Sequence, residues 1–332
     1  MTLATVVAIA MFLGVIAYAL FGGADFGSGF YDLTAGGGQA GRELRTLVDH
    51  SIGPVWEANH VWLIYILVIW WTAFPEAFAA AMTTLFIPLM LALTGIVLRG
   101  ASFAFRKYAA TMGQARLFGA IFAGSSLITP FFLGAVAGAI ASGRVPAQGY
   151  GDRVGSWINP TSLVGGGLAV TTCVFLAGVF LTADATRAGN TELAEKLRAR
   201  TLAVGIVSGL IVFAGLYPIS VDAPTLAAGL RTHASPLLVV AAAAGLAAVV
   251  LLYRRSYSVA RLPAAAAVGA VITGWGAGQY PWMLVDQVTI NDAAGADATL
   301  AGLLVVVGLA GVIVLPALGY LLWLTQTEEW TH

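Results

Sequence analysis

Two ionisable residues, Glu57 and His60, stand three positions apart at the start of an apolar segment that runs to Trp71. Residues three apart share one face of an α-helix, so the carboxyl and imidazole groups would lie on the same side. Pro54 suits the first position of a helix and would put Glu57 in the first turn, near the positive end of the helix dipole. Groups that titrate and lie one hydrogen bond or one water apart can pass protons. The spacing therefore predicts a proton relay.

A further acid, Asp25, falls within the glycine-rich run Phe21 to Gly29, whose glycines allow a bend or the close approach of another helix. We expect Asp25 to close the first apolar span on the same side as Glu57, so that these acids and His60 meet at one depth. Structural roles compete with this interpretation. Asp25 would cap its helix, Glu57 would pair with the helix dipole, and His60 would be a neutral core histidine. Arg99, at the end of a later span, is typical of an interface anchor, or it neutralises one of the acids.

The pair Glu57 and His60 also forms the Glu-x-x-His pattern of di-iron carboxylate bundles. Such a site needs a second Glu-x-x-His and two further glutamates on facing helices, and no other apolar span carries a glutamate with a histidine three positions later. We therefore predict no metal site. A bis-histidine haem is also not expected, because only His60 lies at membrane depth. The single cysteine, Cys173, excludes disulfides.

The elements that would position these groups are transmembrane helices. The 332 residues are 59% hydrophobic and 10% charged, whereas soluble domains are about 25% charged. Apolar runs of about 20 residues, each long enough to cross a bilayer, recur along the chain. We predict an all-α polytopic membrane protein, a single transmembrane domain over 1–332 with four-helix-bundle-like packing. The nine expected spans lie near 4–24, 54–73, 76–98, 115–141, 160–184, 202–220, 235–253, 261–282 and 300–324.

The basic residues predict the orientation of these spans. Of the 16 Lys and Arg residues, only Arg144, Arg153 and Arg231 fall in links on one side of the membrane, and the rest fall on the other. Cytoplasmic links carry the excess of positive charge. The N-terminus is therefore expected outside and the C-terminus in the cytoplasm.

Three motifs in the first third of the chain carry a family resemblance. The run Ser51 to Ile64, with its Trp-Glu-Ala-Asn-His-Val-Trp centre, resembles the signature of subunit II of cytochrome bd-type quinol oxidases. The run Phe21 to Gly29 looks like that family's glycine-rich end of the first span. The run Arg99 to Arg106 looks like its arginine-phenylalanine-arginine link after the third span. The nine-span layout and the length also fit this family.

The resemblance implies a haem-free subunit that pairs with a haem-bearing subunit I, in which haems b and d are expected. Such a complex oxidises quinol on the outer side and reduces dioxygen to water with cytoplasmic protons, so it builds a proton gradient without a pump. The implied location is the cell membrane of a bacterium or archaeon, with no nucleic acid partner. The resemblance leaves room for small accessory subunits and for a structural quinone in this chain.

The resemblance also implies roles for individual residues. Glu57 would be the main acid of a cytoplasmic proton path, with Asp25 and His60 as lesser members. Further residues would shape and seal the path or set its electrostatics: Trp56, Asn59, Trp62 and Arg99. Three positions depart from the family pattern. Glu57 stands where aspartate is common, Gly22 where some members carry an additional acid, and His60 where Gln or Glu is common.

Two other functions stay open. A purely architectural subunit without a proton role would explain the apolar helices and their small residues equally well. A proton-coupled transporter would need broken helices in both halves of an internal repeat, with polar groups near the midplane. The ionisable groups here lie at predicted helix ends in the first third only, which argues against the transporter.

Overall fold

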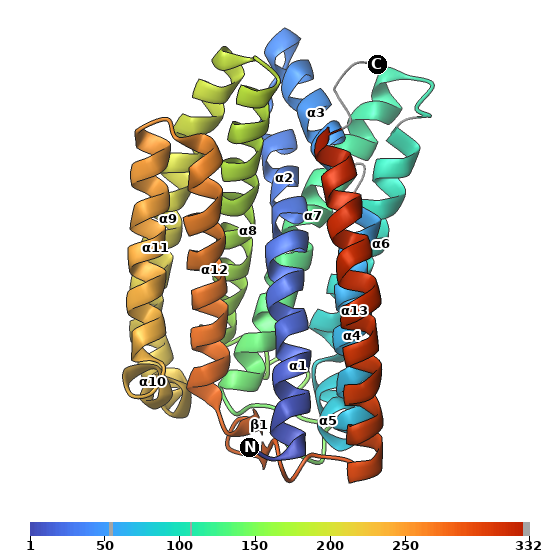
Figure 1. Ribbon diagram of the computed structural model, residues 1–332, viewed down its shortest axis with the longest axis vertical. Coiled ribbons are helices and arrows are strands. Elements are labelled where there is room, and N and C mark those ends of the chain that lie inside the picture. The colour runs from blue at the N-terminus through green and yellow to red at the C-terminus, as the bar shows by residue number, and fades with distance from the viewer. Residues whose placement is uncertain (53–55, 107, 328–332) are drawn as a thin grey trace.

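The computed structural model describes residues 1–52, 56–106 and 108–327, and the side chains of all of these except 52, 56–58 and 321–327. It is an elongated bundle of upright helices (Figure 1). The N-terminus lies at one end, beside α5, α10 and β1, and α13 rises from that end toward the end that carries α3 (Figure 1).

The first span is longer than the sequence predicted. It is one continuous helix over Leu3–Leu33, made of α1 (Leu3–Ala17), a π-helical turn η1 (Tyr18–Gly22) and α2 (Gly23–Leu33). The expectation that Asp25 closes this span is therefore wrong, because the helix continues to Leu33 before Gly36 turns the chain with a positive φ of 76°. Asp25 lies inside the bundle rather than at its edge.

Two further differences follow the first span. An amphipathic helix that was not predicted, α3 (Gly38–Ile52), leads to α4 (Trp56–Ala73). The predicted third span 76–98 is divided into a short helix α5 (Pro75–Thr84) and a long helix α6 (Phe86–Arg106). Pro75 opens α5, whose axis is bent by 118° from that of α4. Arg99 consequently lies two turns before the end of α6 rather than at its end.

The remaining helices and a small hairpin complete the bundle: α7 (Met112–Ala141), α8 (Pro160–Arg187), α9 (Thr191–Asp222), α10 (Pro224–Arg231), α11 (Ser235–Tyr253), α12 (Tyr257–Gln279), β1 (Trp282–Leu284), β2 (Val288–Thr289) and α13 (Asp297–Thr327). The strands β1 and β2 are antiparallel, with Trp282 opposite Thr289. Trp282 thus begins a strand instead of ending the eighth span.

The all-α membrane fold is confirmed. Among the described residues, eight helices are long and apolar enough to span a membrane, and the bent pair α4 and α5 brings the number to as many as nine. The end that carries α3 also holds the α8–α9 and α11–α12 links (Figure 1). Which end faces the cytoplasm stays a prediction.

Candidate functional site

Asp25 and Arg99 form a buried ion pair between the first and third spans. Arg99 Nη2 donates to Asp25 Oδ1 at 2.5 Å, and the two side chains are 1% and 2% exposed for Arg99 and Asp25 respectively. The same nitrogen also donates to the Asp25 carbonyl oxygen at 3.3 Å, and Arg99 Nε donates to Ser126 Oγ of α7 at 3.1 Å. One guanidinium therefore joins α2, α6 and α7.

Aromatic rings enclose this pair. The Arg99 guanidinium carbon lies 5.0 Å from the ring centroids of both Phe26 and Phe122, which is cation–π range. A charge in such surroundings is costly unless it is paired and hydrogen-bonded. The interpretation of Arg99 as an interface anchor is therefore wrong. Its contacts agree with the alternative, in which Arg99 neutralises an acid. The capping role considered for Asp25 fails because the helix continues through this position to Leu33.

The start of α4 packs against the π-helical turn. Asn59 is buried and its Nδ2 donates to the Phe21 carbonyl oxygen at 3.3 Å. Trp62 stacks on the Phe21 ring with a centroid distance of 6.3 Å and an interplanar angle of 14°. A π-helical turn disturbs the regular backbone pairing of the helix, so Asn59 supplies a donor where that pairing changes.

His60 faces the same region as the ion pair. Its ring meets the Tyr18 ring edge-on at 6.4 Å and lies 6.2 Å from the Phe26 ring. Phe26 thus contacts both His60 and the Arg99 guanidinium. The structure therefore brings five of the predicted residues to one part of the bundle: Asp25, Asn59, His60, Trp62 and Arg99.

Two of the predicted residues, Trp56 and Glu57, have side chains outside the described residues. Their backbone belongs to the first turn of α4, as Pro54 and the sequence pattern predicted. Glu57 and His60 are three positions apart on this helix and so share its face. The proton role of both acids stays a prediction.

A second acid–arginine cluster was missed by the sequence analysis. Asp32 is buried and accepts hydrogen bonds from Arg106 and from Arg45 Nε, the latter at 3.0 Å. Arg106 Nη2 also lies 3.4 Å from Asp49. Asp32 follows Asp25 by seven positions and Arg106 follows Arg99 by seven. This shared two-turn spacing was the available signal, and it was not used because the first span was expected to end before Asp32.

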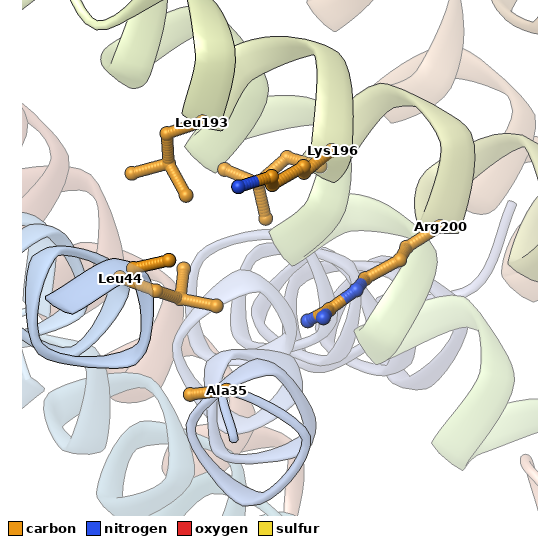
Figure 2. A pocket seen from close by; sticks show the side chains of 7 residues that line it. Ala35, Leu44, Leu193, Lys196 and Arg200 are labelled. Carbon is orange, nitrogen blue, oxygen red and sulfur yellow. The ribbon is translucent and has the colours of Figure 1, made fainter. Parts of the chain in front are cut away.

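A small surface hollow lies apart from the ion pair, between the α2–α3 link and α9. Its volume is about 30 Å³, and Figure 2 shows Leu193, Lys196 and Arg200 facing Ala35 and Leu44 across it. None of these residues belongs to the predicted relay.

The described histidines do not fit a haem in this chain. Haem is a large planar group and needs an apolar slot beside its ligand. The rings of Tyr18 and Phe26 pack against His60, whereas His50 and His233 are exposed at helix ends. We therefore assign no haem to the described part of the chain.

Known proteins resemble this chain over most of its length. The family model for cytochrome bd terminal oxidase subunit II matches residues 3–325. Cytochrome bd ubiquinol oxidase subunit 2 of Bacillus subtilis (strain 168) is 29% identical over 202 residues, which are 60% of this chain and 58% of that protein. Cytochrome bd-I ubiquinol oxidase subunit 2 of Escherichia coli (strain K12) is 29% identical over 205 residues, 59% of this chain and 51% of that protein.

The alignments thus span little more than half the length of these two relatives. A chain in the solved structure of bd oxidase from Geobacillus thermodenitrificans has the same fold, with a TM-score of 0.81 at 22% identity over 99% of this chain and 100% of that chain. Because the family model covers nearly the whole sequence, this chain belongs to the family of cytochrome bd terminal oxidase subunit II.

Proposed function

We propose that this chain is the haem-free second subunit of a quinol-oxidising terminal oxidase and that it supplies a cytoplasmic proton route through Glu57 and Asp25. The observation that carries the proposal is the position of Asp25: a carboxylate in the interior of the bundle, beside the start of α4, compensated by one arginine. Buried ionisable groups in membrane spans are costly and mark ion or proton pathways more often than not.

In this proposal the chain works with a haem-bearing subunit I in the cell membrane. The haems b and d of that partner supply the electron transfer from quinol to dioxygen. The proposed task of this chain is to bring protons from the cytoplasm, so that water formation consumes protons from one side only. Membership of the family and the names of the two relatives, both ubiquinol oxidase subunits, support this assignment.

The residues have distinct proposed roles. Glu57, in the first turn of α4, takes up the proton, and His60 shares its helix face. Arg99 compensates the charge of Asp25 and fixes the rotamer of that carboxylate through Oδ1. Asn59 and Trp62 hold the start of α4 against the π-helical turn, which keeps the entrance narrow.

An architectural role is the second candidate, and one observation favours it. The Arg99 guanidinium links three helices through Asp25 and Ser126, so the pair would be retained for assembly alone. The two candidates predict different effects of removing the charge of Glu57.

The test compares quinol-driven oxygen uptake by the purified complex with Glu57→Gln and with Glu76→Gln, at equal haem content. Removing a positioned proton-transfer group lowers turnover by about 10²-fold or more. We expect that loss for Glu57→Gln. Glu76 lies in the first turn of α5 and is exposed, so Glu76→Gln is the matched control and should retain full turnover. If Glu57→Gln changes neither the turnover nor the haem spectra, the proton role fails and the architectural role remains.

A further inference from the structure

The π-helical turn η1 places a tyrosine against the buried acid. Between Tyr18 and Asp25 the helix carries only Ala, Leu, Phe and Gly side chains, so it offers no polar group over this stretch. Tyr18 is 9% exposed, and its ring lies over Gly22, where a Cβ atom would stand 3.1 Å from two ring carbons. Because Gly22 has no side chain, the Tyr18 ring can occupy the space beside it.

Two buried oxygens in this region lack a hydrogen-bond partner among the described residues. They are the Tyr18 hydroxyl and Asp25 Oδ2, the carboxylate oxygen to which Arg99 makes no hydrogen bond. Both side chains lie beside Phe26: the Tyr18 ring meets the Phe26 ring edge-on with the centroids 6.3 Å apart, and the Arg99 guanidinium that holds Asp25 lies 5.0 Å from the centroid of the same ring.

Apart from His60 and Arg99, the walls around these oxygens are apolar. Tyr18, Phe26 and Cys173 form a buried cluster against which Trp62, Leu63, Ile66, Ile96 and Leu133 pack. Buried polar atoms in such surroundings are normally satisfied by protein groups or by an internal water. A carboxylate oxygen only accepts, whereas a tyrosine hydroxyl donates and accepts. One water molecule that donates to Asp25 Oδ2 and accepts from Tyr18 Oη satisfies both groups.

We propose that Tyr18 Oη and Asp25 Oδ2 bind one internal water molecule, and that Tyr18 is a further relay residue of this subunit. The inference rests on the proposed proton function. Tyr18 precedes Asp25 by seven positions on the same continuous helix, on the side away from α3. It carries the proton past the stretch that has no polar side chain.

The transfer conserves protons at every oxygen. Protonation of Asp25 Oδ2 reverses the two hydrogen bonds, so that the carboxyl group donates to the water and the water donates to Tyr18 Oη. The carboxyl proton passes to the water, the water gives one of its own protons to Tyr18 Oη, and the hydroxyl releases its original proton to a second water molecule on its far side. Only O–H bonds break and form, Asp25 returns to a carboxylate that keeps Arg99 on Oδ1, and Tyr18 is never left as phenolate.

The test uses Tyr18→Phe in the complete complex, which removes one oxygen and keeps the ring over Gly22. The matched control is Tyr31→Phe, on the same continuous helix and fully buried, whose hydroxyl shares a hydrogen bond of 3.3 Å with Thr201. Two quantities are measured at equal haem content. One is the O–H stretch of internal water in infrared difference spectra, identified by its shift in H₂¹⁸O. The other is quinol-driven oxygen uptake in H₂O and in D₂O.

We expect Tyr18→Phe to lose one water band, to slow turnover by roughly tenfold or more and to raise the solvent isotope effect, while Tyr31→Phe retains all three wild-type properties. An intact set of water bands or an unchanged turnover in Tyr18→Phe would overturn the inference. Glu57→Gln, measured in parallel, separates the two proposals. If Glu57→Gln stops turnover and Tyr18→Phe does not, only the role of Tyr18 fails, whereas full activity of Glu57→Gln removes the proton route itself.

Discussion

At the scale of single residues, the decisive feature is that Arg99 and Asp25 are both inside the bundle. Arg99 has every contact that a buried guanidinium needs: a carboxylate, a carbonyl, a hydroxyl and two aromatic faces. Neither member of the pair can be replaced without leaving the other charge uncompensated in apolar surroundings. The same property suits a relay, because the pair as a whole is neutral and its second carboxylate oxygen stays available.

The ion pair predicts that substitutions at Asp25 and Arg99 have strongly coupled effects on stability. Asp25→Asn and Arg99→Met should each cost about 3–5 kcal/mol of stability, because each leaves one buried charge without its partner. The double variant should cost clearly less than the sum of the single variants. Thermal unfolding of the purified complex measures these differences. Arg187→Met is the control, since Arg187 pairs with Asp184 at an exposed site and such pairs contribute about 0–1 kcal/mol. Additive effects of the single substitutions would contradict the coupling.

At the scale of helices, the sequence predicted that another helix packs closely against the first span, but it did not predict the length of that span. The glycine run Phe21 to Gly29 was expected to admit another helix, and Gly27 does so: a Cβ atom there would collide with the backbone of Cys173 in α8. The extension to Leu33 was missed because a charged residue normally ends an apolar run. The partner that makes Asp25 tolerable is Arg99, 74 positions later, and no local pattern reveals it.

The helix α3 was missed for a related reason. Its charged residues look like those of a solvated link, and its anchors are distant in the sequence: Arg45 bonds to Asp32, and Ser51 donates to Asp184 at 3.1 Å. The site residues that could be predicted were those in local patterns, such as Glu57 and His60 one helical turn apart and Asp25 in its glycine run. Tyr18 depends on tertiary contacts and could not be selected by spacing, whereas Asp32 had a spacing signal that was hidden because the first span was expected to end before it.

Gly27 gives a prediction at this scale. Gly27→Ala should destabilise the contact between α2 and α8 by about 1–3 kcal/mol or more, because the added methyl group meets backbone that cannot rotate away. Gly119→Ala on α7 is the matched control: a Cβ atom there meets nothing within 4 Å, and alanine favours a helix over glycine by roughly 0.5–1 kcal/mol. The unfolding temperature should fall for Gly27→Ala and be unchanged or higher for Gly119→Ala. Equal stability of the two variants would show that the helices can separate at little cost.

At the scale of the whole molecule, the two ends of the bundle differ in charge. Within the described part of the chain, the end with α3 and the α8–α9 and α11–α12 links carries most of the arginines, whereas the opposite end holds three, Arg144, Arg153 and Arg231. At that opposite end the backbone N–H groups of Val154 and Gly155 donate to the Asp152 carboxylate and hold its pKa below its ordinary value. The Asp152 carboxylate is therefore ionised near neutral pH, and the small number of arginines at this end is what the positive-inside rule predicts for an outer surface.

Single-cysteine labelling tests this orientation, because the one native cysteine, Cys173, is buried in the bundle and should stay unlabelled. Val154→Cys and Ala188→Cys place an exposed thiol at the two opposite ends, in the α7–α8 link and just after α8. A membrane-impermeant maleimide added to intact cells should label Val154→Cys and spare Ala188→Cys, and permeabilised cells should show both. The reverse pattern would put the basic end outside. Glu57, which opens α4 at the basic end, would then face the outer side, and a cytoplasmic proton route through it would be excluded. The orientation of the chain therefore decides whether the proposed route through Glu57 and Asp25 can take up protons from the cytoplasm.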